Sequence, residues 1–570
     1  MNPVARSSVA SLMLVLPTLA CASSTAITPD PVPGPTPPAR EAPVTVSEAA
    51  LRSRMADYAH DSMMGREAGT IGNYRATEYI AGELRKIGLE PGGENGTYFQ
   101  TIPMMTRVPV ITIEAAGRPL ELGTDILPLP PVENIPVRIT GDLNGVEVIY
   151  GGRMGAADEI GAEAAQGKLV VLGAALGPDG EPGFALGPSI MKFGGAAGLA
   201  IANLDYATSD VVAFLGAPTG FLDEGAAPAG AIPLTAFVSN SVVERWFGES
   251  IENLQPGTTG PAVQGSFGFE DREPEAPARN VIGILRGIDP ALRNRYVAIG
   301  AHNDHVGVND HAVDHDSLRA YLGVVRPRGA DSEERPATDE EIARVRATLD
   351  SLRGVRPQSR LDSISNGADD DGSGSVTLLG MAEAMATSTE RTRRSMLFVW
   401  HTAEEKGLFG AKYFTDNPTV PRDDIVAQLN IDMIGRGGTD DLPEGGPGYL
   451  QLIGSRRVST ELGDLVETIN TKGNHYFTFD YEYDADGHPD NFYCRSDHYM
   501  YARHGIPIVF FSTGGHRDYH QVTDEAQYID YPKMARVGSF IQALAEAVAN
   551  LDHRVVVDKP KPNPDAPCQQ

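Results

Sequence analysis

Four short runs of apolar and β-branched residues stand out in the second half of the chain, each bounded by polar or turn-forming residues. They are Tyr296–Ile299, Met396–Trp400, Ile425–Ile431 and Pro507–Phe511. Compact apolar runs of this length are typical of strands that are buried on both faces of a largely parallel sheet. The pattern therefore predicts a buried sheet in this half of the chain.

A helical period appears before, between and after these runs. Apolar residues recur every three or four positions from Ala76 to Ile87, and Gly88 follows where a helix C-cap belongs. Ser47 can cap another helix, from about Glu48 to Ala59. Further helical stretches are Val376–Ala386, Gly410–Phe414 and Met534–Leu551. Strands that alternate with helices predict an α/β fold, with a mixed, largely parallel sheet flanked by helices.

Two segments interrupt this alternation. Residues 136–267 contain short β-type runs, such as Lys168–Leu172 and Ile232–Val238, between turns rich in Gly and Pro. We interpret this segment as an inserted β-rich domain, which leaves 46–135 and 268–555 for the main α/β domain. Residues 309–365 are rich in charge and read as a second insertion, with a helical pattern near Asp339–Leu352. Within it, His311 and His315 are expected to lie in a solvated loop.

The N-terminus has the features of an export signal. An apolar stretch follows Arg6, and Ala20-Cys21-Ala22 suits cleavage, so residues 1–22 are predicted to be a signal peptide. Residues 23–45 are rich in Pro and read as a tether. We expect a bacterial protein that is exported, whether periplasmic, envelope-anchored or extracellular, and Cys21 is a candidate for a lipid anchor.

The other end of the chain is expected to be a loose, Pro-rich tail over residues 556–570. Besides Cys21, the chain has only Cys494 and Cys568, and sequence spacing does not decide whether these two form a disulfide. A small buried hydrophobe is the interpretation that we favour for Cys494.

The net charge of the chain excludes one class of partner. The chain of 570 residues carries 47 Lys and Arg against 76 Asp and Glu, which gives a net charge of −29. Such an acidic balance opposes binding to phosphate backbones, so a nucleic-acid partner is excluded. Beyond the N-terminus no apolar run approaches the roughly 20 residues of a membrane span.

Each predicted strand of the sheet leads into side chains that bind metals or transfer protons. The first leads to His302 and Asp304, the second to Glu404 and Glu405, the third directly to Asp432, and the fourth to His520. Asp370 stands just before the helix that begins near Ser375. Because the carboxyl ends of parallel strands meet at one edge of a sheet, these residues are expected to converge.

The residue types fit a site for two metal ions. Imidazole and carboxylate are good zinc ligands, and one carboxylate can bridge two ions. Two histidines and three acidic residues would coordinate the two ions: His302, Asp370, Glu405, Asp432 and His520. Glu404 would stay free to act as a general base, and Asp304 could accept the second imidazole N–H of His302. Any of these residues alone would be unremarkable, and the joint occurrence at strand ends predicts a metal hydrolase.

Five ordered segments resemble the signatures of the di-zinc aminopeptidase family, the metallopeptidase family twenty-eight, which includes bacterial leucyl aminopeptidases and glutamate carboxypeptidase II. They are AHNDHVGV (301–308), NGADDDGSGS (366–375), HTAEEKGLFGAKYF (401–414), LNIDMIGR (429–436) and SDHYMYARHGIPIVFFSTGGHRDYHQVTDE (496–525). Residues 65–93 are similar to the opening helix of that family. The insert resembles a protease-associated domain.

The resemblance implies the zinc exopeptidase fold and two Zn²⁺ ions. It implies that Asp370 bridges the ions, that His302 and Asp432 complete one, and that Glu405 and His520 complete the other. Glu404 would be the general base, and the Asp370–Asp371 peptide is expected to be cis. The implied reaction is removal of N-terminal residues from peptides, with a metal-bridged hydroxide as nucleophile.

Three other functions remain open at this point. A carboxypeptidase or dipeptidase on the same scaffold would need a cation for the substrate carboxylate, and Arg436 or Arg495 could supply it. A binding protein without catalysis is disfavoured because all ligands and the base are present. A single-zinc cyclase of N-terminal glutamine is disfavoured by the β-rich insert. Cobalt or manganese could replace zinc in vitro.

Two features depart from the family. Position 303 is Asn where Tyr is frequent, and the gap of 68 residues between His302 and Asp370 is longer than expected. The insertion at 309–365 could form a lid or rim, so it leaves the specificity open.

Overall fold

The computed structural model describes residues 45–131, 137–177, 180–186, 188–223 and 232–570. The predicted signal peptide and nearly all of the predicted tether lie outside these residues. The described residues belong to one compact unit, Val44–Gln570. Within the described ranges, no helix is long and apolar enough to cross a membrane.

A nine-stranded mixed sheet forms the centre of the main domain, and the predicted strands form its middle. Its path runs β1-β14-β18-β15-β19-β22-β20-β21, with β2 paired to β14. The four central strands, β18, β15, β19 and β22, are mutually parallel, and β14 and β20 flank them in antiparallel pairing. The strands are β1 Glu90–Pro91, β2 Phe99–Thr101, β14 Arg279–Leu285, β15 Tyr296–His302, β18 Ser395–His401, β19 Ile425–Ile431, β20 Tyr449–Ile453, β21 Thr478–Asp480 and β22 Ile508–Ser512.

Both faces of this sheet are buried, which explains the uninterrupted apolar runs. Val297 and Ile299 of β15 join one core cluster, whereas Tyr296 and Ala298 join another. Successive side chains of a strand point to opposite faces, so each face needs its own apolar cover. The mixed α/β fold predicted from the sequence is confirmed.

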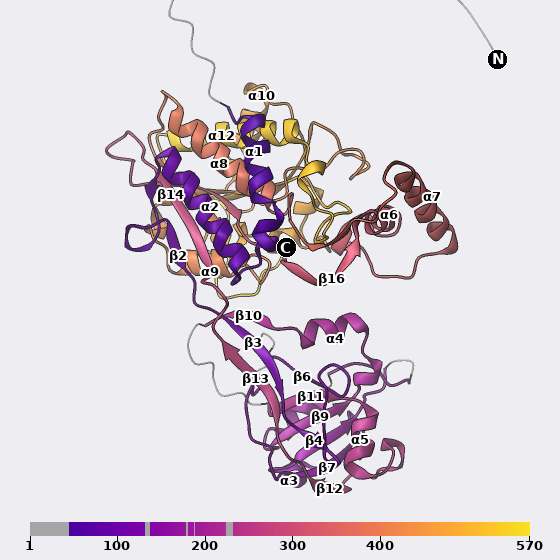
Figure 1. Cartoon of the computed structure of the whole chain (residues 1–570). Coiled ribbons are helices and arrows are strands. Elements are labelled where there is room, and N and C mark those ends of the chain that lie inside the picture. The colour runs from indigo at the N-terminus through magenta and orange to yellow at the C-terminus, as the bar shows by residue number, and fades with distance from the viewer. Residues whose placement is uncertain (1–44, 132–136, 178–179, 187, 224–231) are drawn as a thin grey trace, which may run out of the picture. The chain divides into compact units, whose positions relative to one another are not determined.

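The first cluster lies beneath helices that pack on one another, as Figure 1 shows for α1, α8 and α12. The opposite face is covered by α9 and α11. The helices of the main domain are α1 Glu48–Tyr58, α2 Ile71–Ile87, α8 Gly372–Thr387, α9 Phe409–Asp416, α10 Thr460–Lys472, α11 His498–Ala502 and α12 Tyr531–Asn550. As predicted, Ser47 caps α1, and Gly88 ends α2 with a left-handed φ of 85°. Short 3₁₀ turns are η1 Asp61–Arg66, η2 Glu94–Gly96, η7 Arg422–Asp424, η8 Glu482–Asp484, η9 Phe492–Cys494 and η10 Ala526–Tyr528.

The β-rich insert has sheets of its own, and it begins earlier than predicted. A six-stranded sheet has the order β12-β7-β8-β9-β11-β6, and a three-stranded sheet has the order β10-β3-β13. The strands are β3 Met104–Ile111, β6 Ile126–Pro128, β7 Glu147–Arg153, β8 Leu169–Gly173, β9 Gly198–Ala202, β10 Thr219–Leu222, β11 Leu234–Val238, β12 Thr259–Ala262 and β13 Phe267–Arg272, with a hairpin of β4 Glu114–Ala115 and β5 Arg118–Pro119. Short helices are α3 Ala162–Ala165, α4 Ser209–Gly216, α5 Asn240–Phe247, η3 Pro188–Phe193, η4 Leu204–Tyr206 and η5 Ile251–Asn253.

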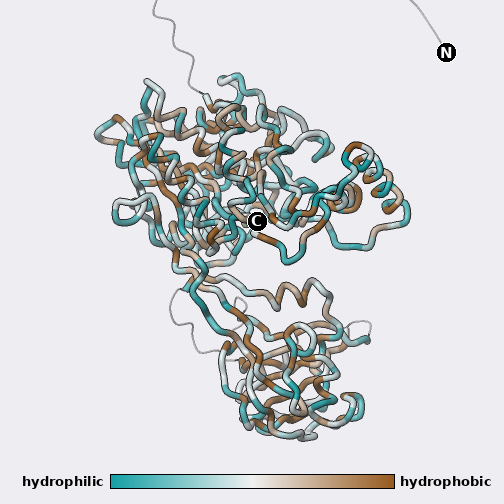
Figure 2. The backbone as a smooth tube through the Cα atoms, viewed as in Figure 1, coloured by the Kyte–Doolittle hydropathy of each residue, from teal (hydrophilic) through white to brown (hydrophobic). Residues whose placement is uncertain are grey.

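The predicted bounds of the insert, residues 136–267, are therefore wrong at both ends, since β13 runs on to Arg272. β3 pairs with β13, and β6 pairs with β11, so both early strands belong to the sheets of the insert. These strands were missed because Pro109 and Pro128 interrupt their apolar pattern. Figure 2 shows apolar segments inside the insert, in agreement with its two separate buried clusters.

The second insertion is a small folded unit rather than a loop. β16 Val308–Asp314 pairs with β17 Leu361–Ile364, and between them lie α6 His315–Val325, η6 Gly329–Asp331 and α7 Asp339–Val355. His311 is exposed, but His315 is fully buried and stacks on Tyr528 at 6.1 Å between ring centroids. The solvated loop expected for His315 is therefore wrong, because α6 turns this side chain inward.

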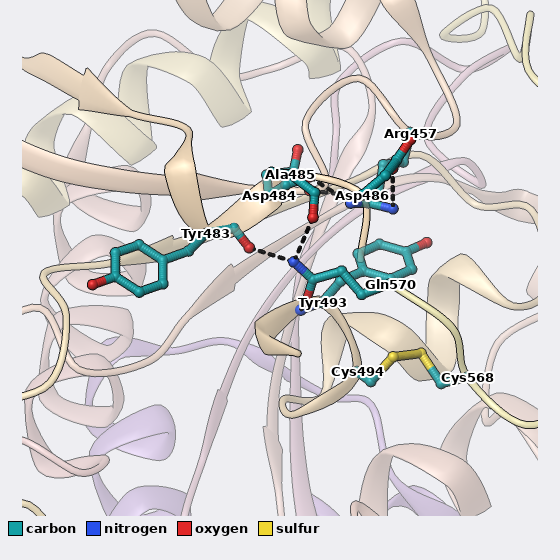
Figure 3. The surroundings of a disulfide bond; sticks show 9 residues. All are labelled: Arg457, Tyr483, Asp484, Ala485, Asp486, Tyr493, Cys494, Cys568 and Gln570. Carbon is teal, nitrogen blue, oxygen red and sulfur yellow. Dashed lines mark hydrogen bonds and ion pairs between the residues drawn. A yellow bond between two sulfur atoms is a disulfide. The ribbon is translucent and has the colours of Figure 1, made fainter. Parts of the chain in front are cut away.

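The C-terminal tail has no helix or strand, yet it is anchored. Cys494 and Cys568 form a disulfide across a sequence separation of 74 residues, which settles the pairing that the sequence left open (Figure 3). The Gln570 side chain accepts a hydrogen bond from Tyr493 N and donates to the carbonyl oxygens of Tyr483 and Ala485. The expectation of a loose tail is corrected by these bonds.

Replacing both disulfide cysteines by Ser should lower the free energy of unfolding by about 2–4 kcal/mol, because the unfolded chain regains the entropy of a long closed loop. Calorimetric melting of the oxidised wild type and the double variant measures this loss. A reductant should lower the melting temperature of the wild type and leave that of the double variant unchanged. Equal melting temperatures for the two oxidised proteins would contradict the prediction.

Candidate functional site

The residues singled out at the strand ends lie close together in the structure. His302 is the last residue of β15, Asp432 follows β19 directly, and Glu405 lies in the loop after β18. His520 lies in the loop after β22. The carboxyl ends of these parallel strands meet at one edge of the sheet, which is the usual place for a site in an open α/β fold.

The first group of potential metal ligands is His302, Asp370 and Asp432. His302 Nε2 lies 3.0 Å from Asp370 Oδ1 and 3.6 Å from Asp432 Oδ1. All three side chains are buried. The other carboxylate oxygen of Asp432 accepts a hydrogen bond from Ser496 Oγ at 2.7 Å, which fixes how the carboxylate is turned.

The second group is Asp370, Glu405 and His520, together with His305, which the sequence analysis missed. His520 Nε2 lies 3.0 Å from Asp370 Oδ2 and 2.9 Å from Glu405 Oε2. His305 Nδ1 lies 2.9 Å from Glu405 Oε1 and 3.5 Å from Asp370 Oδ2. The signal for His305 was available, since it is the second histidine of the motif His302-Asn-Asp-His.

Asp370 belongs to both groups and is held by a frame of hydrogen bonds. Asp524 Oδ2 accepts the backbone N–H of Asp369 at 2.9 Å and that of Asp370 at 3.2 Å. Asp371 caps α8 by accepting from Gly374 N, and it also accepts from His302 N at 3.0 Å. The Asp370–Asp371 peptide is cis, as expected. The frame thus ties Asp370 to the end of β15 and to the start of α8.

Gly374 is where this frame leaves no room for a side chain. A Cβ there would lie 2.4 Å from Asp371 Oδ1 and 2.4 Å from Ile431 O. Gly374→Ala should therefore cost about 1–3 kcal/mol of stability through overpacking. Gly82→Ala on α2 is the matched control, since nothing lies within 4 Å of its Cβ and Ala favours a helix by about 1 kcal/mol. Chemical denaturation of both variants checks the pair, and a neutral Gly374→Ala would contradict the prediction.

Asp304 has a different set of contacts from the one predicted. His302 Nδ1 lies within hydrogen-bond distance of the Asp304 backbone oxygen at 3.1 Å, whereas the Asp304 carboxylate is 3.8 Å away. That carboxylate instead accepts the backbone N–H groups of Glu404 at 3.1 Å and Glu405 at 3.4 Å. Asp304 therefore orients the loop that carries both glutamates, and its carbonyl, rather than its carboxylate, faces the His302 ring.

Glu404 lies outside both ligand groups and lines a cavity of about 300 Å³. Burial raises the pKa of Glu404 well above its ordinary value; nearby His302 opposes the rise, whereas the negative charge of Asp432 adds to it. A carboxylate with a raised pKa is a stronger base than an ordinary one, which suits it to general acid–base catalysis. Glu404 lines this cavity together with Asp370, Glu405 and Asp432 of the two groups.

Two of the three candidate ligand carboxylates have the opposite tendency, whereas burial raises the pKa of the third, Asp432. Burial alone would raise the pKa of Asp370, but the imidazoles of His302 and His520 hold it well below its ordinary value. In the same way, the imidazoles of His520 and His305 outweigh burial and lower the pKa of Glu405 to about 2. These two carboxylates are therefore ionised at neutral pH, as ligands of a cation must be.

The donor set fits zinc. It consists of imidazole nitrogens and carboxylate oxygens, which are the usual zinc ligands besides thiolate. Among the described residues, several buried atoms of these two groups have no hydrogen-bond partner, including His302 Nε2, His520 Nε2 and Asp370 Oδ2. Buried polar atoms are nearly always paired, so an ion at this place would supply the missing partner.

The two arginines named as carboxylate binders differ in their access to the cavity. Arg436 is buried and pairs with Asp441 at 2.8 Å and Asp518 at 3.0 Å, and it is not among the residues that line the cavity. Arg495 lines the cavity, but its guanidinium is engaged by Asp331 of the second insertion.

Comparison with known proteins relates one part of the chain to a family. Residues 280–545 match the model of peptidase family M28. The leupeptin-inactivating enzyme 1 of Streptomyces exfoliatus is 31% identical over 177 residues, which are 30% of this chain and 34% of that protein. A probable leucine aminopeptidase of Trichophyton verrucosum is 34% identical over 108 residues, 18% of this chain and 29% of that protein. The chain thus spans about a third of the length of these curated relatives.

Two solved structures are similar to the chain at lower sequence identity. An aminopeptidase from Aneurinibacillus sp. strain AM-1 gives a TM-score of 0.45 at 14% identity, over 91% of this chain and 97% of that one. A zinc aminopeptidase from Bacillus subtilis gives a TM-score of 0.45 at 14% identity, over 89% and 96%. The assignment rests on the family match instead, whose range contains every ligand candidate from His302 to His520. The range begins after residues 65–93 and after the insert, so the resemblance of those two segments stays a prediction. Residues 280–545 of the chain form a domain of peptidase family M28.

Proposed function

We propose that the protein is a zinc-dependent aminopeptidase that removes N-terminal residues from peptides. The observation that carries the proposal is the pair of ligand groups that share Asp370, with Glu404 free beside them in a cavity. One of the curated relatives named above carries a fitting name, a probable leucine aminopeptidase.

We propose two zinc ions for this site. His302 and Asp432 would hold one ion, Glu405 and His520 would hold the other, and Asp370 would serve both. His305, whose Nδ1 faces the second group, is a further potential ligand there. When bound, zinc polarises a carbonyl oxygen and lowers the pKa of a bound water.

The residues of the chain supply the proton transfers and the positioning. Glu404 accepts a proton from the attacking water and delivers it to the leaving amine, since its raised pKa allows it to hold and release a proton. Asp304 keeps Glu404 in place through the backbone N–H of that residue. The apolar part of the cavity wall would contact the side chain of the N-terminal residue.

A carboxypeptidase or dipeptidase is the second candidate, and Arg495 is the observation that favours it. Arg495 is a cation in the cavity wall, and a substrate carboxylate could reach it only by replacing Asp331. Because Asp331 already occupies both ends of the guanidinium, we favour the aminopeptidase.

Three further parts of this proposal rest on the sequence alone. They are export to the periplasm, the envelope or the medium, a lipid anchor at Cys21, and the assignment of the insert as a protease-associated domain. Mass spectrometry of the mature protein, purified from its own host, tests the first two through the mass of the N-terminal peptide.

Peptides with a free or an acetylated N-terminus test the activity. We expect the first residue to be released only from the free peptide, and a chelator to abolish the release. Mass spectrometry identifies the product. Release from the C-terminus, or cleavage of the acetylated peptide at the same rate, would contradict the proposal.

A further inference from the structure

The wall of the cavity beside Glu404 combines candidate metal ligands with apolar side chains. The apolar side chains include Leu408, Met433, Phe492 and Phe510. Among them stands one ion pair, Arg495 with Asp331. A cavity of about 300 Å³ is at the small end of ligand pockets, so it suits one side chain rather than a long segment of peptide.

Asp331 reaches this cavity from η6 of the second insertion. Its carboxylate accepts hydrogen bonds from Arg495 Nη1 at 3.1 Å and from Nη2 at 3.0 Å. A carboxylate that takes two parallel N–H groups of a guanidinium forms the strongest and most directional kind of ion pair. The insertion therefore places an anion on the cationic part of the cavity wall.

The remaining contacts of Arg495 hold the guanidinium in place. Its Nη2 donates to Tyr519 Oη at 3.3 Å, and its centre lies 4.9 Å from the centroid of the Phe492 ring. Asp331 and Arg495 keep 21% and 34% of their side chains exposed, so the pair forms part of the surface that an incoming side chain meets.

We propose that Asp331 is a specificity-determining residue, which neutralises Arg495 so that the cavity accepts an uncharged, apolar N-terminal side chain. Without Asp331, Arg495 would keep its charge and lack its partner, and an acidic substrate side chain could take the vacated position. Specificity is a difference between two affinities, and an unpaired positive charge in the cavity wall shifts that difference in favour of an acidic substrate. This inference rests on the proposed aminopeptidase function.

The test compares two fluorogenic substrates, one with N-terminal Leu and one with N-terminal Glu, on the full chain loaded with zinc. For Asp331→Asn, we expect the ratio of kcat/KM for Glu to that for Leu to rise by about 10-fold or more. Arg495→Met added to this variant should return the ratio to the wild-type value, because the charge responsible is gone. Zinc content and melting temperature identify folded variants, and Asp331→Ser serves if Asp331→Asn does not fold.

Asp350→Asn is the matched control. Asp350 lies on the exposed helix α7 of the same insertion and does not line the cavity, so the ratio should stay at the wild-type value. A wild type that is active on the Leu substrate, with an unchanged ratio in Asp331→Asn, would overturn this inference alone. New cleavage at the C-terminus by Asp331→Asn would also overturn it, since Arg495 would then bind a main-chain carboxylate. A wild type inactive on both substrates would overturn the proposed function, and this inference with it.

Discussion

Glu404→Gln should keep its zinc and lose nearly all turnover. General acid–base catalysis contributes about 10²- to 10⁴-fold, so we expect kcat to fall by that factor while KM changes little. The amide has the shape of the carboxylate but cannot accept a proton at neutral pH. Zinc should remain, because Glu404 stands outside both ligand groups.

Steady-state kinetics on the Leu substrate and zinc analysis by mass spectrometry check both parts of this result. Glu383→Gln is the control, since that side chain lies on α8, is 46% exposed and pairs with Arg54 away from the cavity. A Glu404→Gln variant with more than about a tenth of the wild-type kcat would rule out Glu404 as the general base. Loss of zinc from this variant would show instead that Glu404 is a ligand.

The strand-end positions could be predicted because local sequence determines them. A buried parallel strand is visible as an apolar run, and the residue that follows it must lie at the carboxyl edge of the sheet. The positions of His302 and Asp432 at this edge therefore follow from the predicted strands alone. The short loops after β18 and β22 keep Glu405 and His520 near the same edge.

The contacts that orient these residues could not be predicted, because they depend on the shapes of loops. Asp524 accepts two backbone N–H groups of the Asp370 loop across 154 and 155 residues of sequence. Asp304 was given the wrong contact for the same reason, because its carboxylate turns toward the glutamate loop and only its carbonyl faces His302. Side-chain hydrogen bonds to the backbone leave no periodic signal in a sequence.

His305 and Asp331 show two different limits. His305 was overlooked because five ligands already satisfied two ions, although its spacing from His302 made it visible. Nothing in the sequence distinguished Asp331 from the other acidic residues of its charge-rich insertion. Its proposed role depends on its contact with Arg495, which is 164 residues away. The position of the insertion relative to the cavity had to come from the structure.

Asp370→Asn should impair both zinc positions at once, because Asp370 is the one residue shared by the two groups. An amide offers one neutral oxygen where two charged oxygens face His302 and His520 at 3.0 Å each. We expect zinc to fall below one ion per chain and activity to fall to background. Asp432→Asn and His520→Asn should each lower the zinc content less, since each belongs to a single group.

Thermal melting separates loss of metal from loss of fold. A ligand that binds only the folded state stabilises it by about 2.7 kcal/mol at 100 times its dissociation constant, so added zinc should raise the melting temperature of the metal-free wild type. The same addition should leave Asp370→Asn nearly unchanged. Asp350→Asn, which removes one negative charge from exposed α7, should respond like the wild type. If Asp370→Asn instead gained the full zinc-induced stabilisation, Asp370 would not bridge, and the two ligand groups would have to bind their ions independently of it.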